Sequence, residues 1–329
     1  MRITLRDVAK DAGVSMKTVS RVVNGDPRVL PGTEQRIRES IARLGYRPNL
    51  AARSLRSGSD DTVGIVVDSV ADPFFAAIVG ALEDLLEPHG FSVLSASTRG
   101  QEDRERKVIS SLAQRSVRGC ILAPWHTTSV PADLEGIPLV FIDRLPAGIP
   151  ADAVLVEDFE SSRHAVTHLI EHGHRRIAFL GDNPILPTTR DRLRGYLTAL
   201  RDAGIEPDPS LQMDCCPDAL TASTSTKKLL AAQSPPTAIF IAGSRQAAGV
   251  VSAMSERQRH RVALISFGDL AIANAIRPAL TVIQHDQTAI ARDAVKLLLR
   301  RIADPTAEPQ VIRQRLALIQ RGSGELIPR

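Results

Sequence analysis

From Val63 onward, short apolar runs alternate with longer segments of helical periodicity. Such runs are typical of parallel strands buried on both faces, with crossover helices between them. We therefore predict an α/β body of two doubly wound sheets, whose strands would direct their carboxyl ends toward a ligand cleft. The predicted strands lie at 63–67, 119–123, 138–142, 153–156, 177–181, 238–242, 262–267 and 280–284. The predicted helices lie near 74–87, 102–115, 159–172, 188–203, 219–231, 245–255 and 288–301.

Composition excludes several classes of protein. Of the 329 residues, 43% are hydrophobic and 24% are charged, which suits two or three compact units. No apolar run approaches the roughly 20 residues of a membrane span, and the opening MRITLRDVAKDAG lacks the apolar stretch of a secretory signal. The three cysteines suit neither a disulfide framework nor a four-ligand zinc site. We therefore expect a cytoplasmic protein with no membrane association.

The first 59 residues are strongly basic. They contain 12 Lys and Arg against 5 Asp and Glu, a net charge of +7, whereas residues 60–329 contain 29 against 32, a net charge of −3. A basic head on a slightly acidic body favours a module that binds a polyanion. Because the charge alone fits a solvated basic face equally well, the residue pattern must decide.

Three short helices are predicted in this head. The first spans Leu5–Ala12 and ends at Gly13, which tolerates a left-handed conformation. Ser15 is the expected N-cap of the second, which carries a stripe of three valines. The third is expected to begin at Thr33 as its N-cap and to end at Gly45. Two short helices joined by Gly-Val-Ser and closed by a third form a helix-turn-helix, so the head is expected to be all-α.

The second helix of such a motif enters the major groove and reads base edges near its N-terminus. Here Lys17 and Arg21 are placed to donate to guanine, and Met16 to cover a thymine methyl group. Backbone amides at Ser15 and in the first turn suit a phosphate. We predict that double-stranded DNA contacts Ser15, Met16, Lys17, Thr18 and Arg21.

The segment PNLAARSLRSGSD at 48–60 predicts one more short helix. Asn49 can cap it, and Ala52 and Leu55 share one side. A helix of this length is unstable alone in water, so we expect it to form against a partner.

Several motifs resemble the LacI/GalR family of bacterial transcription regulators. The head reads TLRDVAKDAGVSMKTVSRVVNG and then LGYRPNLAARSLRSG. The later segments DPFF, VFIDR, EHGHRRIAFLG, RLRGYLTAL and RPALTVIQHD also match, so the resemblance spans nearly the whole chain. It implies a helix-turn-helix head, a hinge helix and a two-lobed body similar to the periplasmic sugar-binding proteins.

The resemblance also implies a mode of action. It implies a homodimer whose heads occupy successive major grooves of a near-palindromic operator. The paired hinge helices would enter the minor groove at its centre, where a leucine wedges between base pairs. Leu55 matches that leucine, and we expect DNA contacts from Asn49, Ala52 and Leu55; alternatively, Leu55 packs on the body. An effector in the cleft would change the spacing of the hinge helices and thus the operator affinity.

Domain boundaries follow from these motifs. We expect a DNA-binding domain at 1–47, a hinge helix and linker at 48–61, and an effector-binding and dimerisation body at 62–329. Lobe 1 would consist of about 62–160 and 286–313, and lobe 2 of about 161–283 and 315–329. Because the tail has no sustained leucine heptad, we expect a dimer rather than a tetramer.

Five residues match positions that contact the effector in the family. Phe74 matches an aromatic or apolar lining residue, and Asp143 and Arg144 follow a strand end. Arg192 matches the arginine of the motif R-x-x-G-[FYW], and His285 follows the strand LTVIQ. The resemblance implies that all five line the cleft.

Two motifs depart from the family pattern. Its usual Asn-Asp-x-x-Ala reads GSRQA at 243–247, and its usual Gly-[FY]-Asp-[DN] reads SFGD at 266–269. Because both changes remove an aspartate, the cleft is expected to be less acidic than a typical sugar pocket. We hypothesise an anionic effector, or a sugar bound through Asp269, with Ser244 and Arg245 as further contacts. Alternatively, Arg245 only forms a surface salt bridge.

The chain lacks the common catalytic motifs. It has no G-x-G-x-x-G opening a βαβ unit, no P-loop and no G-x-S-x-G, so we expect neither an enzyme nor a cofactor. His164, His168 and His172 have a spacing that can bind zinc or nickel, but the family often has histidine in this region without a metal, and no metal site is expected. The predicted function is a sequence-specific DNA-binding repressor controlled by a small-molecule effector. The alternative is a ligand-independent architectural DNA-binding protein with a degenerate cleft.

Overall fold

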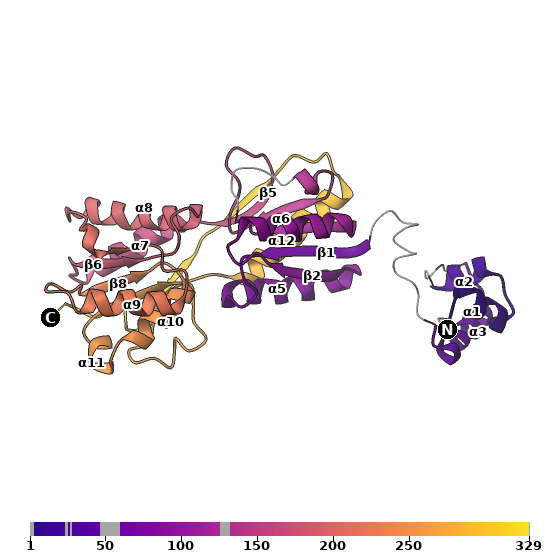
Figure 1. The fold of residues 1–329 in the computed structure, drawn as a ribbon, viewed down its shortest axis with the longest axis horizontal. Helices are drawn as coiled ribbons and strands as arrows, with labels where there is room; N and C mark the ends of the chain where they lie inside the picture. Colours follow the sequence, from indigo (N-terminus) through magenta and orange to yellow (C-terminus); the bar gives the residue numbers. More distant parts are fainter. Residues whose placement is uncertain (1–2, 24–25, 27, 47–59, 126–131, 329) are drawn as a thin grey trace. The chain divides into compact units, whose positions relative to one another are not determined.

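The computed structural model describes residues 3–23, 26, 28–46, 60–125 and 132–328. The chain divides into two compact units, Met1–Asp60 and Asp61–Arg329, called the head and the body below (Figure 1). None of the described helices combines the length and apolar character that a bilayer crossing requires.

The head is a three-helix unit made of α1 (Leu5–Ala12), α2 (Met16–Val23) and α3 (Pro31–Leu44). Its small core contains Val8, Val19 and Ile37, each fully buried. Apolar residues recur at helical spacing on each element, so each helix turns one stripe toward this core. The expected all-α head is confirmed.

The ends of the head helices follow local chemistry. Gly13 ends α1 with φ +66°, as its missing Cβ allows. The Ser15 hydroxyl accepts the Thr18 amide at 3.1 Å and caps α2 as expected. The predicted N-cap at Thr33 is wrong, because α3 begins at Pro31 after Leu30. Proline suits the first helical position because its φ is already helical and its missing N–H would have no partner there.

The first sheet of the body has the strand order β11-β5-β4-β3-β1-β2, and its pairings β11–β5, β5–β4, β4–β3 and β1–β2 are parallel. Helices α5 (Pro73–Leu86) and α12 (Gln287–Ala303) pack together on one face, and α6 (Glu102–Gln114) covers the other. The strands are β1 (Asp60–Val67), β2 (Ser92–Ser97), β3 (Val117–Leu122), β4 (Leu139–Ile142), β5 (Asp152–Val156) and β11 (Val311–Gln314).

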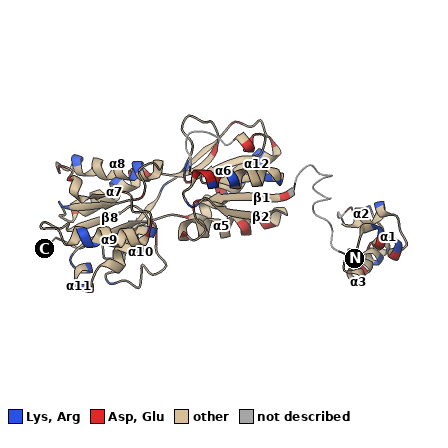
Figure 2. Ribbon diagram, in the orientation of Figure 1, with Lys and Arg blue, Asp and Glu red and all other residues tan. Residues whose placement is uncertain are grey.

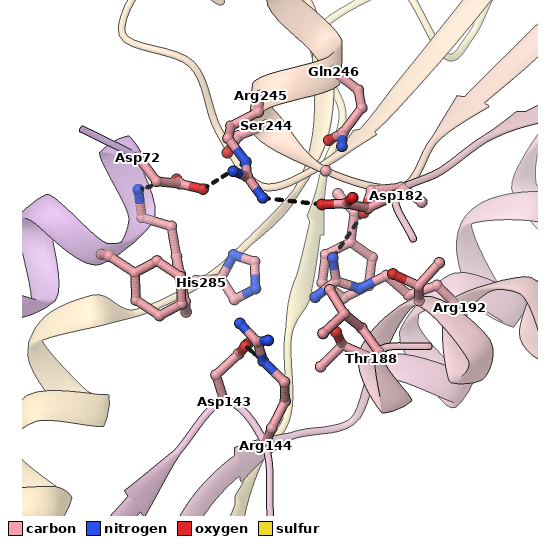
Figure 3. A pocket seen from close by; sticks show the side chains of 17 residues that line it. Asp72, Asp143, Arg144, Asp182, Thr188, Arg192, Ser244, Arg245, Gln246 and His285 are labelled. Carbon is pink, nitrogen blue, oxygen red and sulfur yellow. Dashed lines mark hydrogen bonds and ion pairs between the residues drawn. The ribbon is translucent and has the colours of Figure 1, made fainter. Parts of the chain in front are cut away.

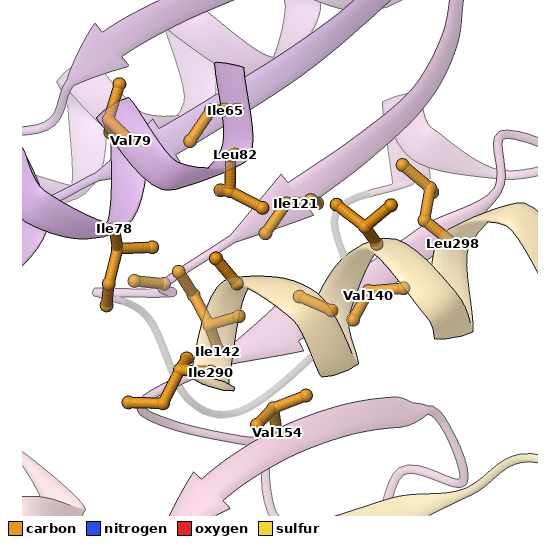
Figure 4. Packing of buried hydrophobic residues seen from close by; sticks show 14 of the residues in the cluster. Ile65, Ile78, Val79, Leu82, Ile121, Val140, Ile142, Val154, Ile290 and Leu298 are labelled. Carbon is orange, nitrogen blue, oxygen red and sulfur yellow. The ribbon is translucent and has the colours of Figure 1, made fainter. Parts of the chain in front are cut away.

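Figure 4 shows the aliphatic layer between this sheet and its two helices. Ile65 and Ile121 from the strands meet Leu82 of α5 and Leu298 of α12, and all four side chains are fully buried. Burying a side chain of this kind contributes roughly 1.5–3 kcal/mol, so this layer is a major source of stability for the body. Helix α6, on the opposite face of this sheet, carries charged residues of both signs (Figure 2).

The second sheet has the strand order β12-β10-β9-β8-β6-β7. Its pairings are parallel except for β12, which runs antiparallel to β10. Helices α7 (Asp158–Glu171) and α8 (Pro187–Asp202) cover one face, and α9 (Ala219–Leu230) and α10 (Ser244–Ala253) cover the other. The strands are β6 (Ile177–Leu180), β7 (Gln212–Met213), β8 (Ala238–Ile241), β9 (Ala263–Phe267), β10 (Thr281–Gln284) and β12 (Ala317–Ile319).

These two sheets confirm the predicted doubly wound α/β architecture. The chain passes from the first sheet to the second after β5. It returns to the first sheet at α12 and crosses to the second sheet again between β11 and β12. The sheet with α5, α6 and α12 is called lobe 1 below, and the sheet with α7 to α10 and the short α11 (Glu256–Arg259) is called lobe 2.

Two helix glycines offer a matched test of packing in the body. A Cβ at Gly249 in α10 would lie 2.1 Å from the Ala219 carbonyl oxygen, whereas a Cβ at Gly80 in α5 would have no heavy atom within 4 Å. We expect Gly249→Ala to destabilise the body by about 1–3 kcal/mol through overpacking. Gly80→Ala should instead add roughly 0.5–1 kcal/mol, because alanine restricts the unfolded chain. Denaturant unfolding measures both, and equal effects would contradict the close approach of α9 and α10.

Candidate functional site

The first candidate site is the exposed face of α2 in the head. Met16 is 53% exposed, Lys17 and Arg21 are exposed, and Thr18 is half-buried beside Ser15. The three valines lie on the opposite side, so the apolar stripe fixes which side chains face outward. The structure therefore brings the five residues predicted to contact DNA onto one short helix and its cap. Their contact with DNA stays a prediction.

Three further residues predicted to contact DNA, Asn49, Ala52 and Leu55, lie outside the described residues. The hinge helix and the wedge role of Leu55 are therefore still predictions.

The second candidate site is a cavity between the two lobes, where strands of both sheets end (Figure 3). Its volume is about 70 Å³, which is room for roughly five water molecules. Its lining consists of Asp72, Phe74, Phe75, Asp143, Arg144, Asp182, Leu186, Thr188, Thr189, Arg192, Ala242, Gly243, Ser244, Arg245, Gln246, Phe267 and His285. Seven of the eight residues predicted to bind an effector are in this set.

Arg192 is fixed by three contacts within lobe 2. Its Nε donates to Asp158 Oδ1 at 2.7 Å, its Nη1 donates to the Ala242 carbonyl at 2.7 Å, and its guanidinium lies 3.9 Å from the centre of the Phe267 ring. Burial raises the pKa of Asp158 to about 6, although Arg192 opposes the shift. Helix α8, which carries Arg192, packs closely on α7 at Gly195, where a Cβ would meet the backbone of α7.

Asp143 and Arg144 form a buried pair at the end of β4. Arg144 Nε donates to Asp143 Oδ2 at 2.7 Å, and the two side chains are 4% and 8% exposed. Asp143 has φ +65°, a conformation that costs a non-glycine residue energy and is concentrated at functional sites. Arg144 Nη1 has no hydrogen-bond partner in the described part of the chain. This N–H group is therefore available to a ligand.

His285 lies between two aromatic rings at the end of β10. Its ring centre is 4.7 Å from that of Phe74 and 5.3 Å from that of Phe267. Burial, together with the charge of Arg192, lowers the pKa of His285 to about 3. The imidazole is thus neutral, with one donor and one acceptor, and among the described residues neither nitrogen has a partner.

Arg245 lies in the cavity lining, and it pairs with three carboxylates. Its guanidinium is 3.1 Å from Asp72 and 2.9 Å from Asp182 (Figure 3). It is also 3.2 Å from Asp68, which lies outside the lining of this cavity. Burial raises the pKa of Asp72, and the charge of Arg245 opposes this shift. The alternative of an isolated surface pair is wrong, because two of the partners are almost fully buried. Sequence reasoning missed all three aspartates, although Asp68 directly follows β1 and Asp182 is the second residue after β6.

Asp269 does not line the cavity. Its two carboxylate oxygens accept hydrogen bonds from Arg321 at 2.8 and 2.6 Å, which also lowers its pKa. Gly268, with φ +91°, occupies the position next to Ser244 and His285 instead. The expected use of Asp269 in the cleft therefore differs from what the structure shows, because Arg321 holds its carboxylate elsewhere.

The three histidines of α7 do not form a metal site in this structure. His168 pairs with Glu325 at 2.9 Å through Nε2, and His172 Nδ1 lies 2.8 Å from the His168 carbonyl oxygen. Over the residues that the structure describes, no three side chains of His, Cys, Asp or Glu gather as ligands. His168 instead ties α7 to the C-terminal tail.

Known proteins resemble both parts of the chain. The family described as "Bacterial regulatory proteins, lacI family" matches residues 4–49, and "Periplasmic binding protein-like domain" matches residues 166–324. The HTH-type transcriptional regulator GalR of Escherichia coli (strain K12) is 31% identical over 317 residues, which cover 94% of this chain and 91% of that protein.

Solved structures agree with this likeness. A complex of the transcriptional regulator CelR with cellobiose is 29% identical, with a TM-score of 0.72, and the match covers 98% of this chain and 100% of that one. The Lac repressor bound to ONPG in its repressed state is 25% identical, with a TM-score of 0.86 and coverage of 98% and 100%. The likeness therefore extends over the head and both lobes.

Proposed function

The chain belongs to the LacI family of bacterial regulatory proteins, and from that membership we propose that it acts as a dimer that represses transcription at a near-palindromic operator. In this proposal an uncharged, polyhydroxylated effector of the sugar class binds in the cavity between the lobes. Its binding changes the operator affinity by altering the relation of the two lobes. Allosteric coupling of this kind is typically about 1–3 kcal/mol, or roughly 5–150-fold in affinity.

The general function is established by family membership. The relatives are transcriptional regulators, so the expectation of a DNA-binding repressor with an effector-binding domain, and not an enzyme, is confirmed. The dimer, the operator and the effector are the proposed parts.

The basic head supports the DNA half of the proposal. Met16, Lys17 and Arg21 lie outward on α2, in the position from which a recognition helix reads base edges. A single head of this size makes too small a contact for high specificity, which favours two heads on a two-fold operator.

One observation carries the effector half: each arginine of the cavity lining already has a carboxylate partner. Arg144 pairs with Asp143 at 2.7 Å, Arg192 with Asp158 at 2.7 Å, and Arg245 with Asp182 at 2.9 Å. An anionic ligand that used any of these arginines would lie beside the carboxylate of its pair, whose negative charge would repel it. Hydroxyl groups can instead donate to the carboxylates and accept from Arg144 Nη1, so a sugar fits this lining better. The similar regulator CelR, whose solved structure is a complex with cellobiose, is an example of a sugar-bound regulator.

The test combines operator selection with a ligand screen. The purified full-length protein should enrich a near-palindrome from a random DNA pool. Calorimetry with neutral sugars and with sugar phosphates should then detect tight binding only of a neutral ligand, and that ligand should change operator affinity. Tight binding only of phosphorylated ligands would restore the anionic hypothesis. A ligand that binds without changing operator affinity would contradict the effector role and favour the architectural alternative.

Substitutions on α2 provide a separate prediction. We expect Lys17→Ala and Arg21→Ala each to cost about 1–3 kcal/mol of operator binding and to relax base preference at outer half-site positions. Arg36→Ala on α3, which also removes an exposed positive charge from the head, is the matched control and should change the preference little. Repeated selection with each variant measures this. A loss that is equal for all sequences would mark Lys17 and Arg21 as phosphate contacts instead.

A further inference from the structure

Arg245 connects the two lobes. It is the second residue of α10 in lobe 2, yet its guanidinium contacts Asp68 at the end of β1 and Asp72 at the start of α5, both in lobe 1. Its third partner, Asp182, follows β6 in lobe 2. The Arg245 side chain is 30% exposed, whereas those of Asp68 and Asp72 are 6% and 10% exposed. The ion pairs therefore lie in a partly enclosed space, where screening by salt is weaker than on an open surface.

Arg245 also separates two cavities. The inner one is the 70 Å³ cavity described above, and a larger space of about 510 Å³ lies on the other side of Arg245. Asp182 and Arg245 line both, so these two side chains form the wall between them. The outer space, called the vestibule below, is lined in addition by Asp68, Ser69, Arg99, Gly100, Trp125, Asn183, Cys215 and Pro217.

The inner cavity also contains buried polar groups that have no hydrogen-bond partner among the described residues. Arg144 Nη1 and both ring nitrogens of His285 are buried at the inner cavity without hydrogen-bond partners among the described residues. Such groups cost free energy unless something bonds to them. A space for about five waters with three unpartnered polar atoms is therefore a site that is built for a ligand but is closed by a side chain.

We infer that Arg245 is the gate of the effector site: it ties the lobes together without a ligand, and the effector enters from the vestibule by exchanging its hydroxyl groups for the guanidinium at Asp72 and Asp182. The gate makes the closed arrangement of the lobes the ground state of the free protein. A ligand then opens the gate only if its bonds to these carboxylates and to Arg144 and His285 outweigh the three ion pairs. This inference concerns the regulation of the site and rests on the proposed function for the identity of the ligand.

Trp125 supplies the probe for this gate. It is the single tryptophan of the chain, and it lines the vestibule from lobe 1. If the ion pairs hold the lobes together, breaking them should expose its ring to solvent. We expect the acrylamide quenching constant of the free full-length protein to rise by about twofold or more in Arg245→Gln, as a shift from a mainly closed to a mainly open population would produce.

Two further variants show whether a rise in quenching comes from the lost ion pairs or from a folding defect of Arg245→Gln alone. Asp72→Asn removes the shorter of the two ion pairs that cross between the lobes, without changing the shape of the side chain, and should raise quenching in the same direction. The double variant should quench no more than Arg245→Gln alone, because both changes remove one shared interaction. Arg163→Gln, which breaks an exposed pair with Glu160 on α7, is the matched control and should leave quenching unchanged.

The outcomes are separable from those of the proposed function. Equal quenching constants in the wild type, Arg245→Gln and Asp72→Asn, with all three proteins folded by circular dichroism, would overturn the gate. The measurement uses neither DNA nor effector, so a failure to find an operator or a sugar ligand would contradict the proposed function without changing this result.

Discussion

Ile37→Ala is expected to abolish operator binding while the body stays folded. Ile37 is fully buried in the head, where it packs in one cluster with Val8, Ala9, Val19 and Val22. Truncation of a buried isoleucine to alanine typically costs about 2–5 kcal/mol. A unit of about 45 residues has little stability to lose, so this substitution should unfold the head. Without an ordered α2, operator affinity should fall by at least about 100-fold, which corresponds to roughly 3 kcal/mol.

The measurement pairs operator binding with thermal unfolding of the full chain. The head transition should shift to lower temperature or disappear, and the transition of the body should stay in place. Leu30→Ala is the matched control, because Leu30 lies in the same head but is 74% exposed and should be replaced at little cost. Retained operator affinity in Ile37→Ala would mean that DNA alone restores the helix packing, and would contradict the expected dependence on the folded core.

The head was largely predictable because its signals are local. Gly13 and Ser15 define the turn between α1 and α2 through backbone conformation and capping, which depend on neighbouring residues only. The one incorrect boundary, at Thr33, arose because two helix-start signals lie two residues apart. Pro31 begins the helix earlier, and its fixed φ outweighs a threonine cap.

In the body, the buried central strands were predicted and four peripheral strands were missed. The strands β1, β3, β4, β5, β6, β8, β9 and β10 contain apolar runs, which the burial of both faces requires. The sequence of β2, SVLSAS, alternates with small polar residues, and β7, β11 and β12 have only two to four residues each. Their pairing depends on the neighbouring strand, so sequence periodicity alone gives no signal for them.

The sequence predicted where the cleft lies and several of its lining residues, but it did not predict how the charged side chains pair there. The family resemblance identified Asp143, Arg144 and His285 correctly as cavity lining, and all three follow the ends of strands. A search of the residues after β1 and β6 would also have found Asp68 and Asp182. The pairing of Arg245 with Asp68 and Asp72 could not have been deduced, because these ion pairs depend on how closely the two lobes approach each other. For the same reason, nothing local showed that Arg321 would hold Asp269 outside the cavity.

Arg192→Met is expected to destabilise the body by about 3–5 kcal/mol near pH 8, the usual cost of leaving a buried charge without its partner. Arg192 is the partner of Asp158, whose side chain is 7% exposed, and the two are joined at 2.7 Å. The effect should be much smaller near pH 5. Burial already places the pKa of Asp158 at about 6 in the folded protein, against an ordinary value of 3.8, so protons bind more tightly to the folded state. The stability that the protonated Asp158 carboxyl group contributes to the folded body is therefore present at low pH, and it is lost as the pH rises through about 6.

Denaturant unfolding of the wild type and Arg192→Met between pH 4.5 and 8 measures this difference, and the pH dependence separates a lost ion pair from lost packing. Asp158→Asn combined with Arg192→Met should recover most of the stability at pH 8, because no buried charge is left unpaired. Arg201→Met, an exposed arginine in the last turn of the same helix, is the control and should change stability little at any pH. If the cost of Arg192→Met were the same at pH 5 and pH 8, the Phe267 and Ala242 contacts would be its source, and the ion pair with Asp158 would not determine the stability of this side of the cavity.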